Sequence, residues 1–155
     1  MPINPTKSLA DYLAAGAVSV DLKARDKPEA LSELCALLDA SKVPMNGASI
    51  LEAVRGRESA GTTGIGDGVA VPHARCPAVG ETFLAVGLSR AGVPFDAPDQ
   101  VPVRIFFLLV GPPDSSSLHL RLLAQIAQTV KDSAMRTRLL AAETSDQVVQ
   151  LLRGP

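Results

Sequence analysis

Apolar positions in the first third of the chain recur first with the period of a strand and then with the period of a helix. Residues 18–22 alternate apolar and polar side chains, which is typical of a half-buried strand. Before them, residues 8–15 are expected to form a short opening helix with Ser8 as its N-cap. After them, a helix is predicted to open at residues 27–29, where Pro28 suits a first-turn position. Its apolar residues recur with a period near 3.6 and are Leu31, Leu34, Cys35, Leu37 and Leu38. A further helix is predicted from Asn46-Gly47 to near Arg57.

The middle of the chain reads as strands separated by turns. Short strands are expected at residues 69–71 and 82–88. Residues 101–110 form a near-continuous apolar run, as expected of a central strand that is buried on both faces. Residues 92–99 are rich in turn formers and residues 111–117 are expected to form a loop.

Helical periodicity returns in the last forty or so residues, where three helices are predicted. The first covers residues 118–130, a break near residues 131–133 starts a short second helix, and residues 144–146 cap the third. Helices therefore concentrate at both ends, and the chain shows no internal repeat. This order predicts a single α/β domain with a mixed β-sheet flanked by helices.

Composition limits the function classes more than it limits the fold. The chain has 155 residues, which suits one domain, and a formal net charge of −1. No basic excess and only 3% aromatic residues argue against nucleic acid as a partner. No apolar run is long enough to suggest membrane insertion, and no signal peptide is apparent. The two cysteines, Cys35 and Cys76, do not make a disulfide scaffold, so a cytoplasmic protein is the simplest expectation. Cys35 lies on the apolar face of its helix and is expected in the core.

A run rich in glycine and hydroxyl groups ends in one of the two histidines of the chain. It reads Gly61-Thr62-Thr63-Gly64-Ile65-Gly66-Asp67-Gly68-Val69-Ala70-Val71-Pro72-His73-Ala74-Arg75. Neutral imidazole is a nucleophile near pH 7, and glycine-rich backbone brings N–H groups close to a phosphoryl group. The run therefore predicts that His73, which is expected to close a short strand, carries a phosphoryl group.

Two further residues complete the expected site. His119 opens a helix after a serine loop and is expected to reach the phosphoryl group or His73, while Arg57 is suited to clamp phosphoryl oxygens bidentately. Thr62, Thr63 and the amides from Gly64 through Gly66 to Gly68 are expected to add phosphoryl-binding donors. No metal or other cofactor is expected, because the charge passes from one phosphohistidine to another.

Other interpretations of the same residues stay open. Judged from the residues alone, His119 is better interpreted as an exposed residue of a first helical turn, and Arg57 equally well as a charge that complements a helix dipole. His73, Cys76 and His119 are a conceivable zinc site, although no second motif pairs with the His-x-x-Cys spacing. A passive module that binds an anion at the glycine run is a third alternative. The role of Arg75, a solvated charge or part of a partner surface, is undecided.

The whole motif, with Arg57-Glu58 ahead of Gly61, resembles the active-site signature of the fructose/mannitol-type enzyme IIA proteins of the bacterial phosphoenolpyruvate-dependent phosphotransferase system. The segment Leu118-His119-Leu120-Arg121-Leu122-Leu123-Ala124 resembles the second histidine segment of that family. The resemblance covers almost the whole chain. Thr62 stands where the family more often has serine, and Cys76 is not part of the family pattern.

The resemblance implies a phosphocarrier. It implies one domain over residues 1–155, with a core over residues 8–153 and a mixed sheet of the five-stranded type. By this resemblance His73 is phosphorylated through Nε2, His119 is the supporting histidine and Arg57 the conserved arginine. The implied donor is phospho-HPr or its nitrogen-branch relative. The chain is similar to the regulatory nitrogen branch; the alternative is a IIA component that serves a separate IIB/IIC sugar transporter.

Overall fold

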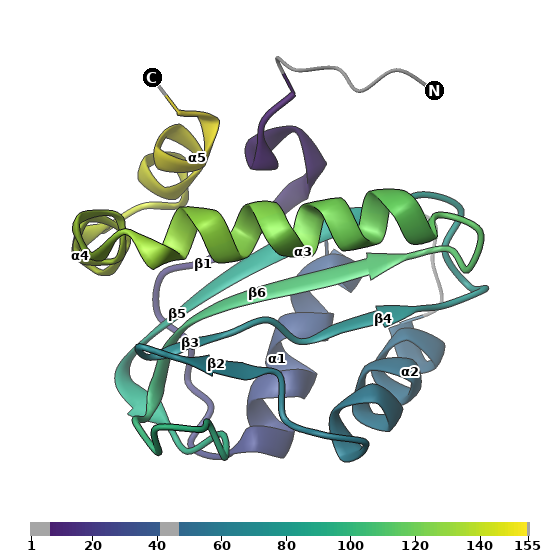
Figure 1. The fold of residues 1–155 in the computed structure, drawn as a ribbon, viewed down its shortest axis with the longest axis horizontal. Coiled ribbons are helices and arrows are strands. Elements are labelled where there is room, and N and C mark those ends of the chain that lie inside the picture. Colours follow the sequence, from purple (N-terminus) through teal and green to yellow (C-terminus); the bar gives the residue numbers. More distant parts are fainter. Residues whose placement is uncertain (1–6, 41–46, 155) are drawn as a thin grey trace.

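The computed structural model describes residues 7–40 and 47–154. In these residues the chain forms a sheet with helices on both faces (Figure 1). The elements in chain order are η1 (Leu9–Tyr12), β1 (Leu13–Ser19), α1 (Lys27–Ala40), α2 (Gly47–Ser59), β2 (Gly64–Gly66), β3 (Val69–Ala70), β4 (His73–Arg75), β5 (Phe83–Val93), β6 (Val103–Gly111), α3 (Ser116–Lys131), α4 (Ser133–Ala141) and α5 (Ser145–Arg153).

The sheet is mixed, as the sequence predicts, and contains six strands among the described residues. Five of them follow the order β1-β5-β6-β3-β2, and β4 pairs with the far end of β6. β1 is parallel to β5, β5 is antiparallel to β6, and both β3 and β4 run parallel to β6. The five-stranded expectation thus holds for the main path, with β4 as an addition to it.

Strands β3 and β4 are two parts of one interrupted strand along β6. Ala70 pairs with Phe106 and His73 pairs with Leu109, so the register continues unchanged across the gap. Pro72 lies in the gap because it has no N–H to give to a ladder, yet its carbonyl accepts a hydrogen bond from the Leu109 N–H at 3.0 Å. His73 therefore opens β4; the expectation that it closes a strand was wrong.

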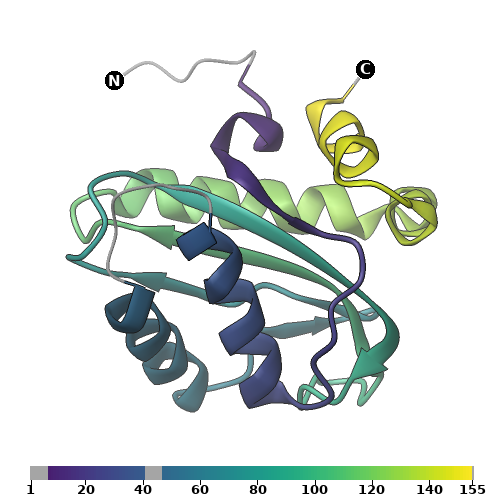
Figure 2. The same ribbon diagram turned by 180° about the vertical axis from the view of Figure 1, so that it is seen from behind.

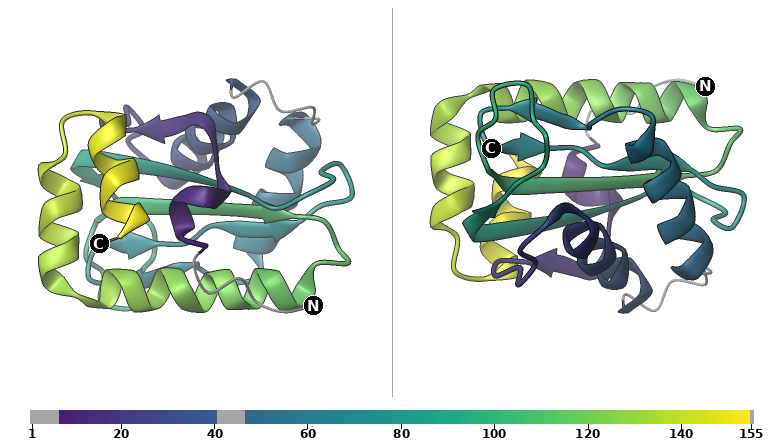
Figure 3. Two further views of the ribbon diagram at one scale, coloured as in Figure 1. Left: turned by 90° about the horizontal axis from the view of Figure 1, so that it is seen from above. Right: turned by 90° about the horizontal axis from the view of Figure 1, so that it is seen from below.

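Each face of the sheet builds its own core. Helices α1 and α2 cover one face, seen from behind in Figure 2. Helices α3 to α5 and η1 cover the other, where α3 runs along the sheet and α4 and α5 lie at one end (Figure 3). The central strand β6 contributes to both cores because alternate residues face opposite ways, with Leu108 on the first side and Leu109 on the second. This confirms the prediction of a central strand buried on both faces.

The N-terminal elements differ from the prediction. In place of a helix over residues 8–15 there is one 3-10 turn, closed by the Asp11 carboxylate, which accepts a hydrogen bond from the Ser8 N–H at 2.7 Å. Strand β1 then starts at Leu13, which pairs with Leu84 of β5, so the strand begins earlier than the predicted residues 18–22. Backbone pairing with β5 outweighs the local helical pattern, because it satisfies N–H and C=O groups along a buried sheet.

Prediction was more accurate for the helices. Helices α1, α3, α4 and α5 begin within a few residues of their expected starts, and Thr144 caps α5 through a reciprocal bond pair with Gln147. Cys35 is buried in the first core, as expected. Asn46, predicted to start the second helix, lies outside the described residues. No helix in residues 7–40 or 47–154 has the length and apolar character needed to cross a membrane.

Candidate functional site

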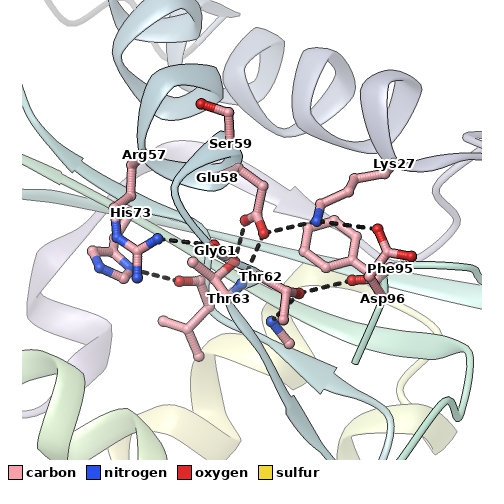
Figure 4. Close-up of polar contacts among 12 residues, drawn as sticks. Lys27, Arg57, Glu58, Ser59, Gly61, Thr62, Thr63, His73, Phe95 and Asp96 are labelled. Carbon is pink, nitrogen blue, oxygen red and sulfur yellow. Dashed lines mark hydrogen bonds and ion pairs between the residues drawn. The ribbon is translucent and has the colours of Figure 1, made fainter. Parts of the chain in front are cut away.

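The imidazole of His73 is oriented by a backbone carbonyl two residues before it in the chain. Its Nδ1 lies 2.7 Å from the carbonyl oxygen of Val71 (Figure 4). A carbonyl only accepts, so Nδ1 carries the proton, and in the neutral ring Nε2 is left with its lone pair. Burial lowers the pKa of His73 below its usual value, the Val71 carbonyl opposes this shift, and the charge of Arg57 adds to it. His73 thus has a neutral ring at neutral pH, with its lone pair on Nε2.

The second histidine faces the first across the end of the sheet. The ring centroids of His73 and His119 are 5.5 Å apart and the planes are inclined at 57°. His119 lies in the first turns of α3 and is 5% exposed. Burial, with smaller contributions from the charges of His73 and Arg75, lowers its pKa to about 4. Its Nδ1 is buried and has no hydrogen-bond partner among the described residues.

Two arginines border the cleft in which the histidines meet. The cleft measures about 650 Å³ and is lined by Ala53, Arg57, His73, Ala74, Arg75, Pro113, Ser116, His119, Leu120 and Leu123. Arg57 lies near the end of α2 and donates from Nη1 to the carbonyl of Gly61 at 2.9 Å. Arg75, whose role the sequence left undecided, donates from β4 to the Ser116 hydroxyl at 2.6 Å. Among the described residues no carboxylate lines the cleft, so its charge and the N-terminus of α3 both favour an anion.

The structure does not bring the four expected phosphoryl-binding residues to this cleft. The Thr62 hydroxyl donates to the Phe95 carbonyl at 2.8 Å, and the Gly64 N–H donates to the Thr62 hydroxyl at 3.1 Å. Both the N–H and the hydroxyl of Thr63 donate to the Glu58 carboxylate. Gly64 and Gly66 belong to strand β2, which pairs with β3. The two threonine hydroxyls and the N–H groups of Thr63 and Gly64 therefore bond inside the protein (Figure 4).

The sequence analysis did not identify Glu58 as the residue that binds Thr63. Its side chain is buried beside the loop that joins α2 to β2. There it also forms an ion pair with Lys27, whose Nζ lies 2.9 Å from Oε2 of Glu58. An acidic residue near the end of a helix ordinarily reads as solvated. The one available signal was its position next to Arg57 in the motif.

Metal binding gains no support from the geometry. Within the part of the chain that the structure describes, no group of three or more His, Cys, Asp or Glu residues is arranged to hold a metal ion. The Cys76 sulfur lies 3.9 Å from the Ser49 carbonyl oxygen and belongs to the core between the sheet and α1 and α2.

Comparison with known proteins places this geometry in a family. Residues 11–154 match the model of the phosphoenolpyruvate-dependent sugar phosphotransferase system EIIA 2 family. The chain is 31% identical over 147 residues to the nitrogen regulatory protein of Bradyrhizobium diazoefficiens, covering 95% of each. It is 26% identical to the fructose-specific EIIABC component of Bacillus subtilis over 93% of its own length, but spans only 23% of that larger protein.

Solved structures agree with the sequence comparisons. Nitrogen regulatory protein IIA-Ntr from Neisseria meningitidis superposes with a TM-score of 0.85 at 30% identity, covering 93% of this chain and 98% of that one. Escherichia coli enzyme IIA for mannitol, solved in complex with phosphorylated enzyme IIB, shares the fold with a TM-score of 0.78 at 21% identity over 92% of this chain and 98% of that one. Sequence and fold lead to the same result: the chain belongs to the EIIA type-2 family of the phosphoenolpyruvate-dependent phosphotransferase system, as a phosphotransferase component.

Proposed function

We propose that His73 is the phosphorylated residue of a histidine phosphocarrier formed by residues 1–155, with its core over residues 8–153. The observation that carries the proposal is the bond from Nδ1 of His73 to the Val71 carbonyl, which leaves Nε2 as the lone-pair nitrogen in a cleft bordered by cations. In the transfer, the Nε2 lone pair forms a bond to phosphorus while the P–N bond to the donor histidine breaks. The electron pair of that bond returns to the donor ring, and the Val71 carbonyl stabilises the positive charge that develops on His73.

The other groups of the cleft hold the transferred group. Arg57 and Arg75 supply donors and positive charge, and the N-terminus of α3 adds its dipole. His119 is neutral before transfer, because its pKa is about 4, and an adjacent dianion raises the pKa of an imidazole. We therefore assign His119 the role of a donor to the phosphoryl oxygens. Thr62, Thr63, Gly64 and Gly66 act in this proposal by shaping the loop and not by direct contact.

A phosphorylated HPr-type protein is the proposed donor, docking over the cleft in the cytoplasm. Leu120 lines the cleft with 68% of its surface exposed and offers apolar contact area beside the reactive nitrogen. Two relatives are named nitrogen regulatory proteins, and the chain covers 95% of the length of one and 94% of the other. Their names favour a regulatory role. Transfer to a IIB protein is the second candidate, favoured by the mannitol IIA structure solved with phosphorylated IIB.

The test is phosphorylation in vitro with intact-mass analysis. Wild type, His73→Ala and His119→Ala are each incubated with phosphoenolpyruvate, enzyme I and HPr, and charging of HPr is verified in every reaction. We expect one acid-labile phosphoryl group on wild type, none on His73→Ala, and slower addition to His119→Ala. Phosphorus NMR of the product distinguishes the Nε2 from the Nδ1 isomer.

Two outcomes would contradict the proposal. If His73→Ala were phosphorylated as fully as wild type, the phosphorylated residue would have to be a residue other than His73. Wild type that stays unmodified in the presence of charged HPr and of a charged nitrogen-branch donor would favour a passive anion-binding module, in which phosphate binding survives His73→Ala.

A further inference from the structure

Glu58 is a buried carboxylate at the centre of the loop behind the cleft. It is 6% exposed and accepts hydrogen bonds from both the N–H of Thr63, at 2.7 Å, and the Thr63 hydroxyl. Lys27, from the start of α1, completes the set with its Nζ 2.9 Å from the carboxylate (Figure 4). A carboxylate with this many charge-assisted bonds holds its partners in one geometry, because each lost bond leaves a buried charge unsatisfied.

The Glu58–Thr63 contact continues to His73 through two backbone bonds. The Thr63 carbonyl accepts a hydrogen bond from the Val71 N–H at 3.0 Å, and the Val71 carbonyl binds Nδ1 of His73. On the other side, the Pro72 carbonyl is held by Leu109 of β6. The Val71 carbonyl, which selects the His73 tautomer, therefore lies between two hydrogen bonds. One joins Pro72 to strand β6, and the other joins Val71 to Thr63 in the loop that Glu58 holds.

Arg57 depends on the same loop. Its guanidinium donates to the carbonyl of Gly61, one of the four residues that lie between Glu58 and Thr63. Lys27 is tied to that region by a second route: its Nζ lies 4.6 Å from the centre of the Phe95 ring, and the carbonyl of Phe95 accepts the Thr62 hydroxyl. The loop that Glu58 holds therefore contacts Arg57 through Gly61 and His73 through Val71.

We propose that Glu58, with Lys27 as its counter-charge, is a positioning residue that sets the tautomer and orientation of the His73 imidazole through Thr63 and Val71. The inference rests on the proposed function for its catalytic consequence, but the ring state of His73 is measurable without any phosphorylation. Glu58 lies outside the cleft lining and does not touch the transferred group.

The closing experiment reads the His73 ring directly. Long-range proton–nitrogen NMR of the unphosphorylated protein reports which ring nitrogen carries hydrogen, and phosphorylation by charged HPr gives the transfer rate and its dependence on donor concentration. In Glu58→Gln we expect a mixture of tautomers, a His73 pKa below that of wild type because the charge of Glu58 raises it, and transfer at saturating donor slowed about 10- to 100-fold. Half-saturation by donor is expected to stay unchanged, since the docking face is intact.

Matched variants separate positioning from folding. Glu52→Gln removes an exposed carboxylate from the same helix and is expected to match wild type in every readout. Thr63→Ser keeps the hydroxyl and is also expected to match wild type, whereas Thr63→Val keeps the shape, loses one donor and is expected to shift the tautomer in the same direction as Glu58→Gln. Circular dichroism confirms that each variant is folded, and Thr63→Val carries the test if Glu58→Gln does not fold.

Folded variants with a wild-type tautomer and a wild-type transfer rate would overturn the inference and leave Glu58 a purely structural residue. A slower transfer that comes only from weaker donor saturation would also overturn it. Failure of wild type to become phosphorylated would overturn the proposed function, and the ring signals would still decide whether Glu58 orients His73.

Discussion

Acidification should destabilise this protein through His119. The residue is 5% exposed, and burial lowers its pKa from 6.5 to about 4 in the folded chain, while the unfolded chain keeps the ordinary value. Between these two values the unfolded state binds a proton that the folded state does not. The free energy of unfolding therefore falls as the pH falls through 6.5, and the fall from this residue is complete below about 4.

The size of the effect follows from the shift. A difference of about 2.5 pKa units, at about 1.4 kcal/mol per unit, sets a limit of about 3 kcal/mol for the full contribution of His119. At pH 5, partway through the window, the linkage relation gives a loss of about 2 kcal/mol relative to pH 7.5. Carboxylates and His73 titrate as well, so the informative quantity is the difference between wild type and a variant without the His119 ring.

Urea unfolding followed by far-ultraviolet circular dichroism at pH 7.5, 6 and 5 measures this difference. Glutamine at position 119 keeps a polar side chain that does not titrate. We expect wild type to lose about 2 kcal/mol more than His119→Gln between pH 7.5 and pH 5. Parallel losses in the two proteins would refute the reasoning, and would mean that water enters the cleft far enough to keep His119 near its ordinary pKa.

Three further predictions concern the nucleophile, a helix cap and the core. Phosphorylation of His73 by charged HPr should reach half of its pH 7.5 rate only below pH 6.5, because burial lowers the pKa of the ring below its ordinary value; a half-maximal rate above pH 7 would contradict this. Thr144→Ala removes the cap of α5 and should lower the free energy of unfolding by about 1 kcal/mol, measured by urea titration. Gly87→Ala should cost about 1–3 kcal/mol in the same assay, because its Cβ would meet the Leu22 Cδ1 at 2.6 Å. Gly80→Ala, which has open space around it, serves as the control and should cost far less.

The helices and the central strand followed from local pattern because burial on one side, or on both, leaves a periodic trace in the sequence. Strand β6 and helix α3 are the clearest cases: one is a continuous apolar run, and the other carries an apolar stripe that packs on the sheet. Strand β1 left such a trace only at its end, at Val18 and Ser19, and strand β4 left none. Each is defined by the neighbour with which it pairs, β5 for one and β6 for the other, and pairing between distant segments is not written in either segment alone.

The same division applies to the site. Sequence alone singled out the candidate residues His73, His119 and Arg57, because imidazole and guanidinium groups suit phosphoryl transfer. Only the tertiary structure decided how those residues are arranged and which partners they have. It brought the two histidine rings to 5.5 Å, added Arg75 to the cleft, and directed the hydroxyl of Thr63 to a buried Glu58. These outcomes depend on desolvation and on hydrogen-bond partners that arrive from other elements of the fold, and a linear pattern of residues does not contain them.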